Sequence, residues 1–128
     1  MFDLAQIPLF ALADRKLAWI DRRQQVLSQD IANADTPGWR AHDVKPFAAL
    51  LQSPPLTLAA TEGEWLPPAD AGSAVAPAET LPTEVSADGN GVVLDAALLR
   101  VADTDMTHTL TTELLRSYMG MFRTAIGR

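Results

Sequence analysis

The chain has 128 residues, enough for one domain of ordinary size, and 48% of them are hydrophobic although only 6% are aromatic. Its net charge of −6 at pH 7 argues against nucleic acid and anionic membranes as main partners. The absence of Cys excludes disulfides, cysteine-ligated metals and a thiol nucleophile, and no apolar run approaches the roughly 20 residues that a membrane span needs. The acidic Asp3, and Arg15 and Lys16 further on, do not fit a cleaved secretory signal.

Residues 8–34 are predicted to form one long amphipathic helix. Apolar residues recur at alternating spacings of three and four, with charged residues between them, which is typical of a narrow coiled-coil seam. This first seam consists of Phe10, Ala13, Leu17, Ile20, Gln24, Leu27, Ile31 and Ala34. Trp19 and Val26 lie off the seam, so the helix has a second face that also favours burial.

The helix is expected to stop in one octapeptide, Ala32-Asn33-Ala34-Asp35-Thr36-Pro37-Gly38-Trp39. Pro37 lacks a backbone N–H, and its ring disfavours the helical region at Thr36. Pro-Gly at the centre of residues 36–39 suits a type II turn in which Gly38 has a positive φ. Nothing helical is expected after it until the second terminal helix.

Residues 41–91 are predicted to form an irregular, acidic excursion from a terminal-helix domain made of residues 1–40 and 92–128. Seven of the nine prolines fall between Pro46 and Pro82, and they forbid long helices there. The patterns favour short strands at residues 56–59 and 92–94, a mobile loop around residues 67–82 and a tight turn at Asp88-Gly89-Asn90-Gly91.

A second helix is predicted over residues 95–126, with Asp95 as its N-cap. Its heptad positions are Leu98, Val101, Asp105, His108, Thr112, Leu115, Met119, Phe122 and Ile126. The polar centre of this series, Asp105, His108 and Thr112, is interpreted as a layer that fixes the register of helix pairing. A metal site at His108 with Asp103 and Asp105 is less favoured, because it offers too few ligands.

The predicted fold is mainly α, with two long terminal helices pairing as a coiled-coil hairpin and an irregular, partly extended middle segment. A two-helix hairpin leaves one side of each helix uncovered, here Trp19 and Val26 on the first helix and Leu114 and Met121 on the second. Such exposure usually marks an interaction surface, so neighbouring subunits are expected to complete the fold. The alternative is a compact bundle in which the middle segment forms a third layer.

No pattern in the chain supports an enzyme. The chain has no Gly-x-Gly-x-x-Gly, no P-loop and no Gly-x-Ser-x-Gly, and its serines have no neighbouring base in sequence. We therefore assign no catalytic residue, cofactor-binding residue or metal ligand, and predict a structural protein that needs no cofactor.

The octapeptide at the end of an amphipathic helix resembles the Ala-Asn-x-x-Thr-Pro-Gly-aromatic signature of bacterial flagellar axial proteins, the rod, hook and hook-associated subunits. Asp43-Val44, the turn at residues 88–91 and the ending at residues 121–126 make the chain most similar to the basal body rod protein family, as a proximal rod subunit. Two departures from the pattern are Asp30, where Asn is common, and Trp39, where Tyr is common. Both are expected to be mild.

The resemblance implies a structural subunit of the periplasmic rod that transmits torque, lines the export channel and is exported without a cleaved signal peptide. Implied partners are further copies of the chain, other rod subunits and the export-gate adaptor protein. The expected assembly seam consists of Leu17, Ile20, Leu27, Ile31, Leu98, Val101, Leu115, Met119, Phe122 and Ile126. Alternatives are the second proximal rod protein or another axial paralogue, and a soluble coiled-coil adaptor or export chaperone.

Overall fold

The computed structural model describes residues 8–52, 77–79 and 84–127 of the chain. Its elements are α1 (Pro8–Ala32), β1 (His42–Val44), α2 (Phe47–Gln52), β2 (Pro77–Glu79) and α3 (Leu94–Ile126). The two long helices end within two residues of their predicted bounds, so the prediction of a mainly helical chain is confirmed. None of the described helices combines the length and apolar character needed to cross a bilayer.

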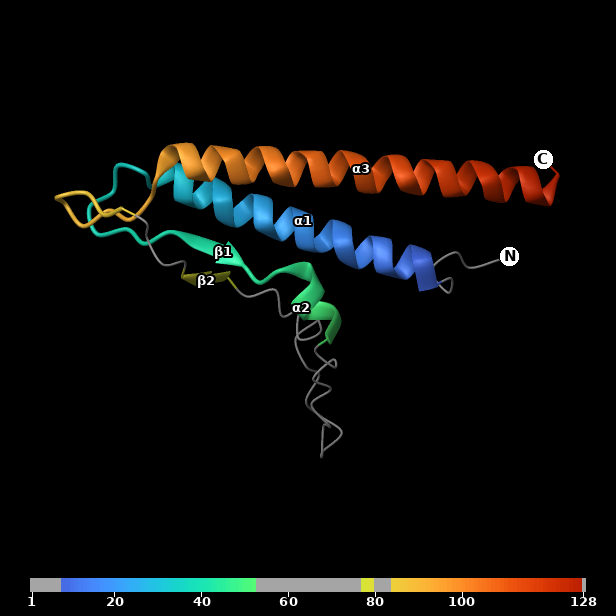
Figure 1. Cartoon of the computed structure of the whole chain (residues 1–128), viewed down its shortest axis with the longest axis horizontal. Coiled ribbons are helices and arrows are strands. Elements are labelled where there is room, and N and C mark those ends of the chain that lie inside the picture. The colour runs from blue at the N-terminus through green and yellow to red at the C-terminus, as the bar shows by residue number, and fades with distance from the viewer. Residues whose placement is uncertain (1–7, 53–76, 80–83, 128) are drawn as a thin grey trace, which may run out of the picture.

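Helices α1 and α3 lie side by side and run in opposite directions, with α3 extending past the start of α1 (Figure 1). Ile20 and Leu27 of α1 are buried, and so are Ala97 and Thr104 of α3. Ala97 and Thr104 are seven residues apart and share one face of the helix. The Thr104 hydroxyl donates to the carbonyl of Arg100 over 2.7 Å, so this buried polar group is satisfied within its own helix.

Near the start of α3, the buried face is rotated by one position from the predicted heptad, whereas the predicted positions Leu115, Met119 and Phe122 further along are half-buried. Ala97 and Thr104 are buried, whereas the predicted positions Leu98 and Asp105 are exposed. One residue corresponds to a rotation of about 100° around the helix axis. His108 is also exposed. The interpretation of a polar layer between the two helices is therefore wrong for Asp105 and His108, because Thr104 is buried there instead, whereas Thr112 is half-buried.

The second apolar face of α1 is covered by the segment that follows the octapeptide. Trp19 and Val26 are buried together with Val44 of β1, and Phe47 and Leu50 of α2 pack against them. The expectation that Trp19 and Val26 would be left on an outer face is therefore wrong: the chain supplies the cover itself.

The outer surface of α3 remains uncovered within this chain, as the sequence predicted. Leu114 and Met121 are 50% and 54% exposed. These two residues match the expectation that the second helix has an apolar face to spare.

The irregular segment holds more regular structure than predicted. Residues 42–44 pair antiparallel with residues 77–79, with Asp43 opposite Ala78. The loop prediction is wrong at residues 77–79, which form β2. The other residues of 67–82 lie outside the described residues. The strand predicted at residues 56–59 lies outside them altogether. Helix α2 was not predicted; it follows Pro46, whose carbonyl accepts from the N–H of Ala49 over 3.0 Å.

The start of α3 also differs from the prediction. Its N-cap is Val93, whose side chain makes no capping hydrogen bond, and the helix begins at Leu94. The strand predicted at residues 92–94 is therefore wrong. Asp95 lies in the first turn, where its charge favours the positive end of the helix dipole, but it is not the N-cap.

Candidate functional site

The octapeptide forms a corner at the end of α1. Gly38 has φ +72°, and the N–H of Trp39 donates to the carbonyl of Thr36 over 3.3 Å, which confirms the predicted turn with a positive φ at Gly38. Asn33 donates through Nδ2 to the carbonyl of Gln29 over 2.8 Å and accepts from the Thr36 hydroxyl over 3.1 Å. The Asn33 side chain thus ties the last helical turn to the start of the tight turn.

Asn90 joins the second irregular segment to this corner. It is 3% exposed, and its Nδ2 donates to the carbonyls of Asn33 and Thr36 over 3.0 and 2.7 Å. Its Oδ1 accepts from the N–H of Val92 over 2.8 Å. Both carbonyls lie beyond the last turn of α1, where helical partners are missing. Asn90 therefore satisfies three backbone groups of a corner whose two halves are more than fifty residues apart.

Backbone hydrogen bonds hold the same two segments together. The N–H of Gly38 donates to the carbonyl of Asp88 over 3.1 Å, and the N–H of Gly91 donates to the carbonyl of Trp39 over 2.9 Å. Gly89 has φ +82°, and an added Cβ there would lie 3.6 Å from the Cα of Gly38, an ordinary contact. Glycine is favoured at Gly89 by its backbone conformation rather than by lack of space.

Asp30 is the buried acceptor of the corner. It is 2% exposed; its Oδ1 accepts from the indole N–H of Trp39 over 3.1 Å, and its Oδ2 accepts from the backbone N–H of His42 over 2.7 Å. The His42 ring lies edge-on to Trp39, with its Nδ1 3.6 Å from Oδ1 of Asp30. The two departures from the signature, Asp30 and Trp39, are thus hydrogen-bonded to each other, which the sequence did not reveal.

Arg23 connects three elements next to the corner. Its guanidinium contacts both carboxylate oxygens of Asp43 in β1, over 3.1 and 3.3 Å, and the carboxylate of Asp103 in α3 over 3.0 Å. Burial acts to lower the pKa of Arg23, but the hydrogen bonds and charges of Asp43 and Asp103 outweigh it and raise that pKa. Arg23 therefore stays charged and positions β1 and α3 against α1.

Two curated relatives resemble this chain, and both are named flagellar basal body rod protein FlgB. The one from Agrobacterium fabrum is 49% identical over 47 residues, which are 37% of this chain and 35%, about a third, of the relative. The one from Salmonella typhimurium is 31% identical over 108 residues, which cover 77% of this chain and 78% of the relative. The chain belongs to the FlgB family of flagellar basal body rod proteins. No model of a protein family matches it.

Membership of the FlgB family confirms the resemblance carried by the octapeptide. All eight residues of that motif lie in or directly before the corner, with Trp39 half-buried and Thr36, Pro37 and Gly38 exposed. Among the residues that the structure describes, no three His, Cys, Asp or Glu side chains lie close enough together to hold a metal ion.

The residues of the predicted seam differ in their exposure in this FlgB-family chain. Ile20 and Leu27 are buried, whereas Leu98 and Ile126 are 50% and 57% exposed. The half-buried members are Leu17, Ile31, Val101, Leu115, Met119 and Phe122. Their role in assembly stays a prediction, because it concerns neighbouring subunits.

Sequence reasoning missed three residues that hold the corner together: Asp30, Asn90 and Arg23. Asn90 stands between two glycines, a setting in which the backbone of a tight turn exposes a carboxamide to a distant partner. The position of Asn90 between Gly89 and Gly91 was therefore the one sequence signal that could have indicated its role. Asp30 and Arg23 look like ordinary charges of a helical surface in the sequence, and no local pattern distinguishes them.

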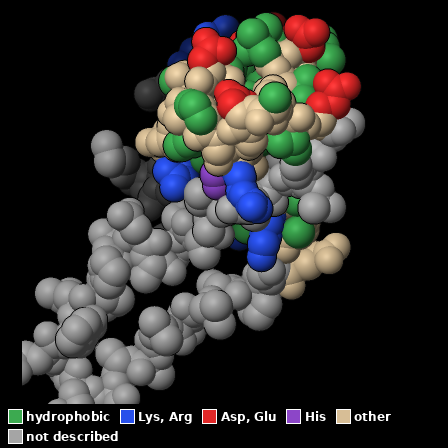
Figure 2. All heavy atoms as spheres, turned by 90° about the vertical axis from the view of Figure 1, so that its left-hand side faces the viewer, with side chains coloured by type: hydrophobic (Ala, Val, Ile, Leu, Met, Phe, Trp, Pro, Cys, Tyr) green, Lys and Arg blue, Asp and Glu red, His purple; other side chains and the backbone are tan. Residues whose placement is uncertain are grey.

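The corner end of the molecule carries charge of both signs. Figure 2 shows Asp and Glu side chains over its upper part, among hydrophobic side chains, and Lys and Arg side chains below, next to a histidine. Asp35 and Asp88 are exposed, and so is Arg40. This end of the FlgB-family chain therefore presents two surfaces of unlike charge beside the corner.

We expect Gly38→Val to destabilise the corner by about 1–2 kcal/mol, because a residue with a Cβ reaches the left-handed region only at that cost. Space is not limiting, since nothing lies within 4 Å of a Cβ added at Gly38. Pro37→Ala should cost less, because it only loosens the helix stop. Urea unfolding followed by circular dichroism measures both changes, and Gly38→Asn, which tolerates positive φ better, is the control. A Gly38→Val variant as stable as the parent would contradict the account.

Proposed function

We propose that this FlgB-family chain is a structural subunit, not an enzyme, that transmits torque through the rod and lines the export channel. Support comes from its two long helices, α1 and α3, and from the apolar surface that α3 leaves uncovered: Leu99 and Met106 are 73% and 75% exposed. This uncovered surface is the observation that carries the proposal. Apolar side chains exposed in this way along one helix are typical of a protein that is completed by neighbours.

The proposal includes the organisation expected from the sequence. Residues 1–40 and 92–128 form the terminal-helix domain, in which α1 and α3 pair as a coiled-coil hairpin, and residues 41–91 form the excursion. The assembly seam, from Leu17 to Ile31 on α1 and from Leu98 to Ile126 on α3, then packs partly within the subunit and partly against other rod subunits. The export-gate adaptor protein is proposed as a neighbour at one end.

The corner has a mechanical part in this proposal. The hydrogen bonds from Asn90 to the carbonyls of Asn33 and Thr36, and the Asp30–Trp39 hydrogen bond, fix the direction in which the chain leaves α1. Arg23 couples that direction to α3 through Asp103. A stiff joint of this kind passes load between the helices and the excursion instead of bending. In the same proposal, the subunit lies in the periplasmic part of the basal body and is exported without a cleaved signal peptide.

The proposal is tested by deleting the gene and isolating basal bodies from the deletion strain. We expect strains without the chain to lack complete rods and motility, and a plasmid copy to restore both. Mass spectrometry of the isolated basal bodies should find the chain in restored cells. Normal rods in the deletion strain would overturn the proposal.

Two charge substitutions separate folding from assembly. Leu27 is 0% exposed, so Leu27→Asp should unfold the chain itself, because it buries an unpaired charge. Phe122 is half-buried near the end of α3, so Phe122→Asp should keep the helical circular dichroism spectrum but abolish incorporation into rods and motility. Thr124→Asp, on the exposed side of the same turn, is the matched control. Normal motility of Phe122→Asp cells would remove this residue from the seam.

A further inference from the structure

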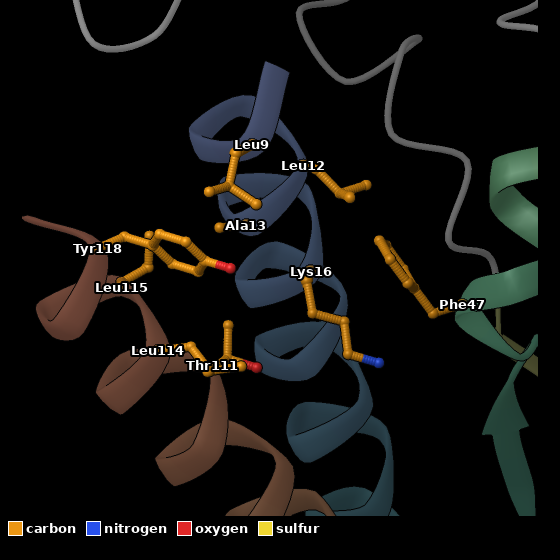
Figure 3. Close-up of a pocket in the computed structure, with 9 residues that line it drawn as sticks. All are labelled: Leu9, Leu12, Ala13, Lys16, Phe47, Thr111, Leu114, Leu115 and Tyr118. Atoms are coloured by element: carbon orange, nitrogen blue, oxygen red, sulfur yellow. The ribbon is translucent and has the colours of Figure 1, made fainter. Parts of the chain in front are cut away.

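An apolar groove lies between the first turns of α1, the start of α2 and the second half of α3. Its volume is about 250 Å³, and its walls are formed by Leu9, Leu12, Phe47, Leu114, Leu115 and Tyr118. In Figure 3, Leu9 and Tyr118 face each other across the α1–α3 side, while Leu12 and Phe47 close the side of α2. The described part of the chain thus contains an apolar hollow flanked by all three helices.

A positively charged group lies at the inner end of this groove. The Nζ atom of Lys16 is 4.3 Å from the ring centre of Trp19 and 4.7 Å from that of Phe47. No carboxylate of the described residues lies within ion-pair distance of it. Burial and the charge of Arg23 lower the pKa of Lys16, and Asp103 only partly opposes them. Lys16 is therefore a half-buried ammonium with aromatic neighbours and no ion-pair partner among the described residues.

The outer face of α3, which borders the groove at Leu114, has the complementary features. Leu99, Met106, Leu110 and Met121 are 73%, 75%, 58% and 54% exposed. They follow one another at spacings of seven, four and eleven residues, which place them on one face of a helix. Glu113 is exposed and stands seven residues after Met106, so its carboxylate borders this apolar face.

We propose that the groove of one copy of this chain receives the outer face of α3 of a second copy, with Glu113 of that copy against Lys16. The inference rests on the proposed rod function and names the surfaces that meet. A partner for this groove must bring apolar side chains and a carboxylate, and the α3 outer face brings both. Because the contact joins two different surfaces of the subunit, it is heterologous and can repeat from copy to copy along a rod.

Charge reversal tests the pair. In the deletion strain, we expect Lys16→Glu and Glu113→Lys each to lower the amount of chain in isolated basal bodies at least tenfold. The double variant Lys16→Glu/Glu113→Lys should recover most of the parental amount, because the contact is restored with opposite signs. Parental incorporation of Lys16→Glu would overturn the proposal. Loss without recovery in the double variant would also overturn it, because the groove then binds a different protein.

Disulfide trapping provides a second measurement that does not depend on charge. The chain has no cysteine of its own, so two epitope-tagged forms, Leu12→Cys and Leu110→Cys, can be expressed together in one cell. We expect a disulfide between the two forms in basal bodies, and none when Leu51→Cys, exposed on α2, replaces Leu12→Cys. Equal trapping by both cysteines would overturn the groove assignment. If the gene deletion itself left rods intact, the proposed function would fail. That outcome is distinct from a failure of the charge-reversal or disulfide-trapping experiment, which would overturn only the groove contact.

Discussion

Asn90→Asp is expected to destabilise the folded chain by about 3 kcal/mol or more. The side chain is 3% exposed, and its Nδ2 donates to two carbonyls. A carboxylate of the same shape cannot donate to either, and it would place a buried negative charge against both oxygens. Asn90→Ala removes the donors without adding a charge, so it should cost less than Asn90→Asp. The isosteric change is expected to be the worse one, which distinguishes lost hydrogen bonding from lost volume.

Urea unfolding at pH 7 measures both variants of Asn90. Asp35→Asn is a suitable control, because Asp35 is exposed within the same octapeptide; it should stay within about 0.5 kcal/mol of the parent. The penalty of Asn90→Asp should be smaller at pH 4, because the neutral carboxyl favoured by burial can donate once. An Asn90→Asp variant as stable as the Asn90→Ala variant would contradict the role assigned to the two hydrogen bonds that Asn90 donates.

Asp30→Ala is expected to cost about 2–4 kcal/mol, because it leaves the indole N–H of Trp39 and the backbone N–H of His42 without their buried acceptor. Asp30→Asn should cost less, since one oxygen still accepts, although the amide nitrogen then faces a donor. Trp39→Tyr supplies a hydroxyl that can accept from this amide. The double variant Asp30→Asn/Trp39→Tyr should therefore be more stable than the sum of its single changes predicts.

The coupling between Asp30 and Trp39 is obtained from unfolding free energies of the parent, the two single variants and the double variant. We expect it to be at least about 0.5 kcal/mol in favour of the double variant. The double variant Gln25→Ala/Trp39→Tyr serves as the additive reference, because Gln25 is exposed on the same helix. Simple additivity at Asp30 would show that the hydrogen bond does not link the two positions.

Local patterns in the sequence predicted the regular parts of this fold. Alternating spacings of apolar residues placed both long helices to within two residues, and Pro-Gly placed a positive φ at Gly38. These features depend on neighbours in the chain, so they are visible in a single sequence. The same is true of the turn at residues 88–91, which lies where Gly89 adopts φ +82°.

The errors concern contacts between distant parts of the chain. Near the start of α3 the heptad was misplaced by one position, because the small residues Ala97 and Thr104, not the larger Leu98, are buried there. Trp19 was expected to be exposed because its cover, Val44, comes from a segment that looked irregular. The partner of Asn33, Asn90, is 57 residues away, and no periodicity connects them.

The corner and the β1–β2 ladder together close the excursion at its base. Between Val44 and Pro77 the chain leaves and returns to almost the same point, since these two residues pair directly. The entropy lost in closing such a loop grows only with the logarithm of its length, by about 0.6 kcal/mol for each doubling. Insertions and deletions between Gln52 and Pro77, which leave the packing of α2 intact, should therefore change the free energy of unfolding little. The size of the excursion can vary in evolution while the corner and the paired helices keep their geometry.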